Sequence, residues 1–219
     1  MTINNPDTNP ALKNFLRYCH IKNYAAKSTL IHIGDYNKKL YFIIKGSVTV
    51  GTIDEDDGRE LIYAYLHEGQ FIGEIGIFNE TEIRMVNIKT RCECQLAEID
   101  HKRLKQLLKS ELAKDAFDIL FMIGKQLSDR LIMTSRNFRD LAFMDVEGRM
   151  ARTLLDLCKE PDAVPHLQGT QIKITRQELS RIVGCSREVA GRVLKELELK
   201  KLITAHGKTI VIFHKEEPS

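Results

Sequence analysis

Arg187, Glu188 and Arg192 lie at a spacing that places all three on one face of a single helix. An arginine can donate two hydrogen bonds to guanine O6 and N7, and a glutamate can accept one from cytosine N4. Gly191 has no side chain, so this face can approach another surface closely. These residue types in this arrangement indicate contact with the base edges of DNA.

The segment before this helix has the signals needed to hold it in place. Thr175 and Glu178 have the spacing of a capping box, in which the threonine hydroxyl accepts a backbone N–H three residues further on. Gly184 permits the positive φ of a tight turn, and Ser186 can cap the second helix. Residues 175–197 are therefore predicted to form a helix-turn-helix, whose second helix enters the major groove. A surface helix with ordinary charge pairs is the alternative, and it explains neither the box nor the turn.

The charge around this segment suits a phosphate backbone. Residues 170–215 contain ten Lys or Arg and four Asp or Glu, an excess of six, although the whole chain carries only +3. A short strand at 171–174 and a hairpin at 202–213 complete the pattern of a winged helix-turn-helix. The Gly207-Lys208 pair in this hairpin is not a phosphate-binding loop of a nucleotide hydrolase, because Leu202 stands where that loop needs a glycine.

The elements before the helix-turn-helix change from β to α along the chain. From residue 25 to about residue 99, short apolar runs are separated by turns, which is typical of a sandwich, barrel or jelly roll. A long helix is predicted from about residue 113 to residue 143. One stripe of this helix repeats at heptad spacing and comprises Leu120, Gly124, Leu127, Leu131, Thr134, Phe138 and Leu141. Such a stripe predicts a homodimer, and the alternative is a helix packed on its own β domain.

Together these patterns predict an α+β protein in three parts. Residues 1–112 are expected to form a β jelly roll, residues 113–144 a dimerisation helix and hinge, and residues 145–219 a winged helix-turn-helix DNA-binding domain. No run of about 18 apolar residues and no signal peptide occurs, which predicts a cytoplasmic protein without a membrane partner. The five cysteines lack CxxC spacing, so we expect reduced thiols and no metal site. No HExxH motif, nucleophile elbow or convincing triad is found, so we do not expect the chain to be an enzyme.

Residues 174–179, 182–188 and 191–195 resemble the reading head of the cyclic-AMP receptor protein (catabolite activator) family. The resemblance covers the chain from Pro10 to Phe213 and includes the family's hinge at 141–146 and wing at 205–209. It implies a homodimer on palindromic double-stranded DNA, with half-sites about 34 Å apart. It also implies a DNA-contacting set. Base contacts are expected from Arg187, Glu188 and Arg192, and phosphate contacts from Thr175, Arg176, Gln177, Ser186 and, in the wing, Lys208.

The run Phe71-Ile72-Gly73-Glu74-Ile75-Gly76-Ile77-Phe78, followed by Arg84, resembles the phosphate-binding cassette of the same family. Its chemistry fits a cyclic nucleotide, because Glu74 can accept from the ribose 2′-OH and Arg84 can pair with the cyclic phosphate. Backbone N–H groups around Gly73 can bind the same phosphate. The resemblance adds Thr134 and Ser135 on the long helix as partners of the adenine. The alternative for Glu74 and Arg84 is a buried salt bridge.

One position departs from the cyclic-AMP pattern. The family usually has a small residue after the cassette arginine, and here the residue is Met85, which offers no hydroxyl and occupies more space. Residues 109–115 also look like an insertion before the long helix. These two features, with residues 187–192, resemble the Clp branch, whose members bind DNA without cyclic AMP and are linked to cyclic di-GMP. Cyclic AMP is the expected effector, with cyclic di-GMP as the alternative.

The family also implies RNA polymerase as a partner. Residues 160–166 match its main activating surface, and His20, Lys22 and Arg103 match a second, basic one. A nucleotide-binding module that acts on a protein, as kinase regulatory subunits do, is a different class, and the capped helix with its arginines argues against it. The oxygen-sensing branch needs an N-terminal cysteine cluster for iron–sulfur ligation, and only Cys19 lies there.

Overall fold

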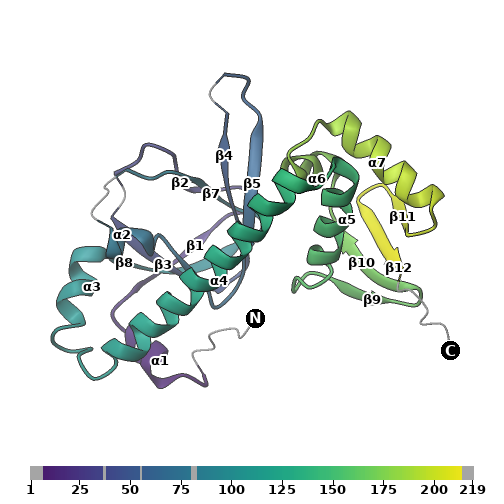
Figure 1. The fold of residues 1–219 in the computed structure, drawn as a ribbon. Coiled ribbons are helices and arrows are strands. Elements are labelled where there is room, and N and C mark those ends of the chain that lie inside the picture. Colours follow the sequence, from purple (N-terminus) through teal and green to yellow (C-terminus); the bar gives the residue numbers. More distant parts are fainter. Residues whose placement is uncertain (1–6, 37, 55, 80–82, 214–219) are drawn as a thin grey trace. The chain divides into compact units, whose positions relative to one another are not determined.

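The computed structural model describes residues 7–36, 38–54, 56–79 and 83–213. They divide into two compact units, one within Met1–Gly58 and Ile62–Thr134 and the other within Arg59–Leu61 and Ser135–Ser219. Each unit has its own apolar core, and one long helix belongs in part to each (Figure 1). The ends of the predicted parts, residues 1–6 and 214–219, lie outside the described residues.

The first unit is built on two four-stranded sheets, with strand orders β1-β8-β3-β6 and β2-β7-β4-β5. Neighbouring strands are antiparallel wherever their register is defined. The strands are β1 (His20–Tyr24), β2 (Thr29–Ile31), β3 (Lys39–Lys45), β4 (Val48–Ile53), β5 (Glu60–Leu66), β6 (Phe71–Ile72), β7 (Asn87–Thr90) and β8 (Cys94–Asp100). The jelly-roll prediction is confirmed, with one difference. Strand β1 begins at His20, before the predicted start of the β region at residue 25. Four of its five residues are exposed, so it lacks the apolar run by which strands are predicted.

Strand β3 is apolar on both faces because it separates two cores. Leu40 and Phe42 belong to the core that the helices cover, whereas Tyr41 and Ile43 belong to the core between the sheets. Successive side chains of a strand point to opposite faces, so both faces of β3 are buried. Strand β3 begins at Lys39, a residue that also takes part in the pocket.

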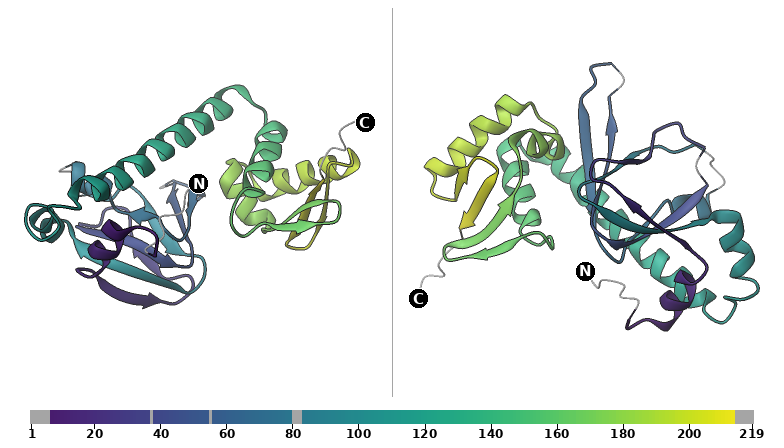
Figure 2. Two further views of the ribbon diagram at one scale, coloured as in Figure 1. Left: turned by 90° about the horizontal axis from the view of Figure 1, so that it is seen from below. Right: turned by 180° about the vertical axis from the view of Figure 1, so that it is seen from behind.

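Four helices pack around this unit: α1 (Pro10–Leu16), α2 (Ile75–Phe78), α3 (His101–Leu107) and the first part of α4 (Ala116–Phe143). Asn9 caps α1 by accepting the Leu12 N–H at 3.1 Å. The Asn14 side chain donates to Asp115 at 2.6 Å, which holds α1 beside the start of α4 (Figure 2). Helix α4 contributes Ile119, Met122 and Ile123 to the core.

Besides the end of α4, the described part of the second unit contains three helices and one sheet of order β11-β12-β10-β9. They are α5 (Val146–Leu157), α6 (Arg176–Val183), α7 (Arg187–Leu199), β9 (Val164–His166), β10 (Gly169–Lys173), β11 (Ile203–His206) and β12 (Thr209–Phe213). Their apolar faces form one core that includes Met150, Leu179 and Leu194. This is the predicted winged helix-turn-helix. In the part of the chain that the structure describes, no helix is long and apolar enough to cross a membrane.

Candidate nucleotide pocket and DNA-reading surface

Gly73 of the cassette directly follows β6 and has a conformation that favours glycine. Its φ is +84°, and a Cβ atom there would lie 2.6 Å from the Lys39 carbonyl oxygen. The backbone then turns into α2, for which Glu74 is the N-terminal cap residue. The glycine therefore lets the cassette lie directly against the start of β3.

Glu74 is buried, with 2% of its surface exposed, and it forms an ion pair with Arg130 of α4. Arg130 also donates to the Phe71 carbonyl at 2.6 Å. Gln126, one turn earlier on α4, accepts the Phe71 N–H at 2.7 Å and donates to the Phe71 carbonyl at 2.9 Å. Two polar residues of the long helix thus hold the strand and the acid that open the cassette.

Arg84, which follows the cassette in the sequence, contacts the backbone of both Gly73 and Lys39. Its guanidinium donates to the Lys39 carbonyl at 2.8 Å and to the Gly73 carbonyl at 3.3 Å. Burial lowers the pKa of this group, and the nearby Tyr41, Glu74 and Asp35 act in the opposite direction. Arg84 forms no ion pair with Glu74 among the described residues, so the alternative of a Glu74–Arg84 salt bridge is not what the structure contains.

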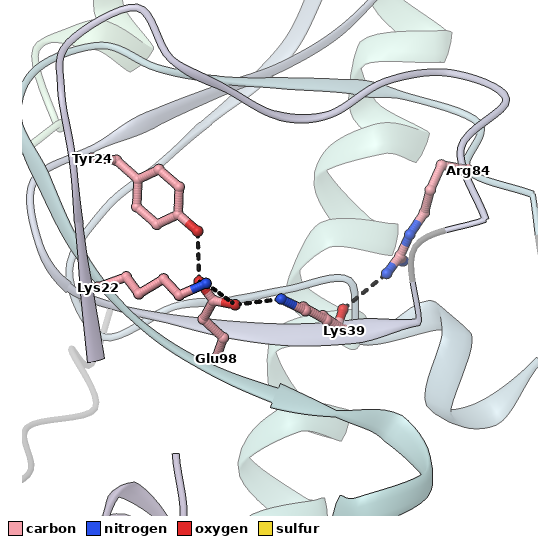
Figure 3. A network of polar contacts seen from close by, with 5 residues as sticks. All are labelled: Lys22, Tyr24, Lys39, Arg84 and Glu98. Carbon is pink, nitrogen blue, oxygen red and sulfur yellow. Dashed lines mark hydrogen bonds and ion pairs between the residues drawn. The ribbon is translucent and has the colours of Figure 1, made fainter. Parts of the chain in front are cut away.

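The carbonyl that Arg84 uses is fixed by a second network (Figure 3). The Lys39 amino group donates to the buried Glu98 carboxylate at 2.6 Å, and the Tyr24 hydroxyl donates to it at 2.6 Å. Lys22 lies 3.2 Å from the same carboxylate. Burial alone would raise the pKa of Glu98, but the hydrogen bonds from Lys39, Tyr24 and Lys22 outweigh it and hold that pKa below its ordinary value.

Several buried polar atoms around the cassette have no hydrogen-bond partner. They include Glu74 Oε2, Arg84 Nε, His101 Nε2 and Arg130 Nε. Leaving such atoms unpaired costs free energy, so their concentration at one place is expected where a ligand supplies the partners. A free carboxylate oxygen suits a hydroxyl, and a free guanidinium N–H suits a phosphate. These residues therefore fit the ribose and phosphate of a cyclic nucleotide.

The remaining predicted pocket residues lie on the surface. Met85 is 82% exposed and so does not fill the cassette. Thr134 and Ser135 are exposed on α4, and Thr134 lies one turn after Arg130 on the same side of the helix. The structure thus brings Gly73, Glu74 and Arg84 together and leaves the other three exposed.

Arg130, Gln126 and His101 were not predicted from the sequence. Arg130 and Gln126 lie four and eight residues before Thr134, a spacing that repeats one helical face and that could have found them. No comparable signal marks His101, because only the fold brings α3 beside α2.

The helix-turn-helix forms as its capping residues indicate. The Thr175 hydroxyl accepts the Glu178 N–H at 3.1 Å at the start of α6. Gly184 ends α6 with a φ of +70°, in the left-handed region that favours glycine. The Ser186 hydroxyl then accepts the Val189 N–H at 3.2 Å at the start of α7.

Helix α7 has one buried and one exposed face. Ala190, Val193, Leu194 and Leu197 are buried in the core of the second unit. The residues expected to meet DNA lie at the surface: Arg176, Gln177, Ser186, Arg187, Glu188, Arg192 and Lys208 are exposed, and Thr175 is half-buried. A Cβ atom on Gly191 would lie 3.8 Å from the Arg176 guanidinium, which is ordinary contact, so none of the described residues requires a glycine here.

The heptad stripe of α4 divides into two parts. Leu127 packs against the core of the first unit and Leu120 is half-buried, whereas Leu131, Phe138 and Leu141 are exposed. Gly124 is open, with nothing near the position of a Cβ. The first turns of the helix therefore pack against the core of the first unit. The later turns present an apolar face that no element of the described chain covers.

Comparison with known proteins agrees with this architecture. A model of the cyclic nucleotide-binding domain matches residues 21–111, and a model of the Crp-like helix-turn-helix domain matches residues 148–217. The chain therefore combines a nucleotide-binding domain with a DNA-binding domain, which defines it as a transcription regulator.

The relatives are regulators and not enzymes. The chain is 49% identical to the cAMP-activated global transcriptional regulator CRP of Salmonella typhimurium, over 97% of this chain and 99% of that protein. It is 50% identical to the cAMP-activated global transcriptional regulator Vfr of Pseudomonas aeruginosa, over 92% and 93%. The solved structure of the c-di-GMP-responsive global regulator CLP from Xanthomonas campestris is 47% identical, with a TM-score of 0.88 over 94% of this chain and 99% of that one. The chain belongs to the cyclic-AMP receptor protein (CRP) family.

Proposed function

We propose that this regulator binds a palindromic operator as a homodimer and that cyclic AMP in the cassette controls the binding. The observation that carries the proposal is the set of unpaired buried atoms at the cassette, on Glu74, Arg84 and Arg130. They lie in the same chain as an exposed arginine face on a capped helix. A sensor and a DNA-reading head in one chain are the parts that such a switch needs.

The pocket chemistry supports a cyclic nucleotide with one phosphate. The Arg84 guanidinium and the cassette N–H groups would bind the phosphate, and Glu74 Oε2 would accept the ribose hydroxyl. Thr134 and Ser135 would meet the base, since they follow Arg130 on α4. Two relatives named as cAMP-activated support cyclic AMP as the effector.

Cyclic di-GMP is the second candidate, and two observations favour it. The residue after Arg84 is Met85, which has no hydroxyl to offer a phosphate. The solved c-di-GMP-responsive regulator is 47% identical in sequence to this chain. A chain of this second type would bind DNA without ligand. The two candidates thus predict opposite states of the protein without nucleotide.

The exposed apolar face of α4 supports the homodimer. Leu131, Phe138 and Leu141 lie on it at the spacing of a two-stranded helical seam. Phe138 is 73% exposed in the single chain, and burying such residues against a second copy removes apolar surface from water. Thr134 lies within this face, so a bound nucleotide would touch the seam and would influence how the two subunits pair.

The DNA-reading head would contact base edges through Arg187, Glu188 and Arg192. Thr175, Arg176, Gln177, Ser186 and Lys208 would contact phosphates. We infer that RNA polymerase is the protein partner and that the protein works in the cytoplasm, where its operator lies. The three-part division at residues 112 and 144 belongs to the same proposal.

Calorimetric titration of the full chain with cyclic AMP and with cyclic di-GMP, each paired with operator binding, tests the proposal. We expect cyclic AMP to bind and to strengthen operator binding, and Arg84→Ala to abolish both effects. Arg17→Ala, which removes an exposed arginine of the same unit, is the control and should keep them. Operator binding without nucleotide that cyclic di-GMP weakens would replace cyclic AMP with the second candidate, and no DNA binding in any state would overturn the proposal.

A further inference from the structure

His101 is a buried histidine beside the cassette to which the proposed function gives no role. It is the first residue of α3, and only 7% of it is exposed. Its backbone N–H donates to the Lys38 carbonyl at 2.8 Å. Its ring lies on α2, because a Cβ atom on Gly76 would be 2.6 Å from the imidazole Cε1. Gly76 therefore provides the space that the ring occupies.

The same ring reaches the start of the cassette. The backbone of Gly73 is a hydrogen-bond partner of the imidazole. Nε2 has no partner, so we assign the contact with the Gly73 carbonyl to Nδ1. Arg84 donates to this carbonyl as well, at 3.3 Å. One carbonyl oxygen thus joins a histidine that can become cationic to the arginine proposed to hold the phosphate.

The surroundings of His101 favour its neutral form over its cationic form. Burial lowers its pKa and so does the Arg84 charge, whereas the Gly73 hydrogen bond and Asp100 raise it. Lys105, on the same helix, lowers it further. Helix α2, which packs on the ring, has no charged side chain. Glu74, before α2, is already paired with Arg130.

We propose that His101 is a positioning residue of the nucleotide site that takes up a proton when the ligand phosphate docks on Arg84, so that nucleotide affinity rises as pH falls. The inference rests on the proposed function and adds a regulation to the same site. The phosphate neutralises the field of Arg84, which is the cationic neighbour that opposes protonation most. The proton comes from solvent and is held on Nε2, the nitrogen that lacks a partner.

The direction of the effect follows from linkage. The bound state has the higher pKa, so binding takes up a proton at pH values between the free and bound pKa of His101. Each unit by which the phosphate raises that pKa changes the affinity by up to about tenfold across this interval. Above the bound pKa the affinity is independent of His101, and below the free pKa the rise stops.

Calorimetry of cyclic AMP binding to the full chain, in buffers of different ionisation enthalpy, measures the protons exchanged. We expect the parent to take up a fraction of one proton per site at mildly acidic pH. The variant His101→Gln should take up none and should bind with an affinity that no longer depends on pH. His32→Gln changes an exposed histidine of the same unit and should leave the uptake unchanged.

Two results separate this inference from the proposed function. If the parent binds cyclic AMP but takes up no proton, or if His101→Gln keeps the uptake, the inference fails and the nucleotide site stands. If the parent does not bind cyclic AMP, both fail. Should His101→Gln not fold, the His101 proton resonances of the parent supply the test. Their titration must shift to higher pH when cyclic AMP is added, and an unchanged titration would overturn the role.

Discussion

The guanidinium of Arg130 on α4 and the carboxylate of Glu74 in the cassette form an ion pair that ties the long helix to the pocket. Arg130 also holds the Phe71 carbonyl at 2.6 Å, so one side chain connects α4 to both the strand and the acid of the cassette. A ligand hydroxyl that binds Glu74 would therefore act on Arg130, which lies one turn before Thr134. Thr134 lies within the apolar face of α4. This connection gives the pocket a physical route to the proposed dimer seam.

Loss of the Arg130 side chain should destabilise the first unit. Arg130→Met leaves the buried Glu74 carboxylate without its cation. We expect a loss of about 2–3 kcal/mol in the free energy of unfolding, below the 3–5 kcal/mol of a fully buried pair because Arg130 remains partly solvated. Urea unfolding measures it. Lys125→Met removes an exposed cation from the same helix and should cost much less. Equal stability of parent and Arg130→Met would show that the pair contributes nothing.

Glu98 should make the first unit sensitive to acid. Although burial raises the pKa of its carboxyl, hydrogen bonds from Lys39, Tyr24 and Lys22 hold that pKa below the ordinary value. A carboxyl whose pKa is lower in the folded state stabilises the fold above its unfolded pKa of about 4.3, and this contribution is lost as pH falls through the folded pKa.

Unfolding of Glu98→Gln by urea across this pH range checks the expectation. The variant should be less stable than the parent at neutral pH, and the difference should shrink in acid. Glu93→Gln, which removes an exposed carboxylate near the same strand, is the control. A difference between Glu98→Gln and the parent that stays constant down to strong acid would contradict the account.

Gly191 should separate stability from DNA binding. The site accepts a Cβ without crowding, since its nearest neighbour would be the Arg176 guanidinium at 3.8 Å. Alanine is favoured over glycine in a helix interior by about 0.8–1 kcal/mol, so Gly191→Ala should raise the free energy of unfolding by that amount. If α7 approaches the groove closely at this position, the same change weakens operator binding. Fluorescence anisotropy measures this operator binding. Unchanged or tighter binding by Gly191→Ala would rule out the close approach.

Base contacts and phosphate contacts should respond differently to mutation. Arg187→Ala or Arg192→Ala should each cost about 1–3 kcal/mol in operator binding and relax specificity at one base pair. Lys208→Ala in the wing should instead weaken binding to all sequences alike and reduce its salt dependence. Binding measurements on the operator and on single-base variants separate the two roles. An Arg187→Ala variant that discriminates these sequences as well as the parent does would exclude base reading there.

The local parts of this structure could be predicted from the sequence because local physics produces them. Thr175, Gly184 and Ser186 act on the backbone within a few residues, and each takes the conformation that its type favours. The order of jelly roll, long helix and winged helix-turn-helix follows in the same way from turns and apolar periodicity.

The pocket was predicted only in part because its remaining contacts are long-range. Arg130 lies 56 residues from Glu74 along the chain, and in the sequence it resembles an ordinary surface cation of a helix. His101 reaches the cassette only through the packing of α3 on α2. Met85 attracts attention in the sequence as a departure from the family, yet its side chain lies at the surface.

Control of the DNA-reading head by the cassette can be measured as the affinity of the full chain for a palindromic operator, followed by anisotropy as cyclic AMP is added. We expect at least about a tenfold gain at saturation, a coupling free energy of about 1.4 kcal/mol, and no gain for Arg84→Ala. An operator affinity that neither cyclic AMP nor cyclic di-GMP changes would contradict the claim that the cassette controls the DNA-reading head.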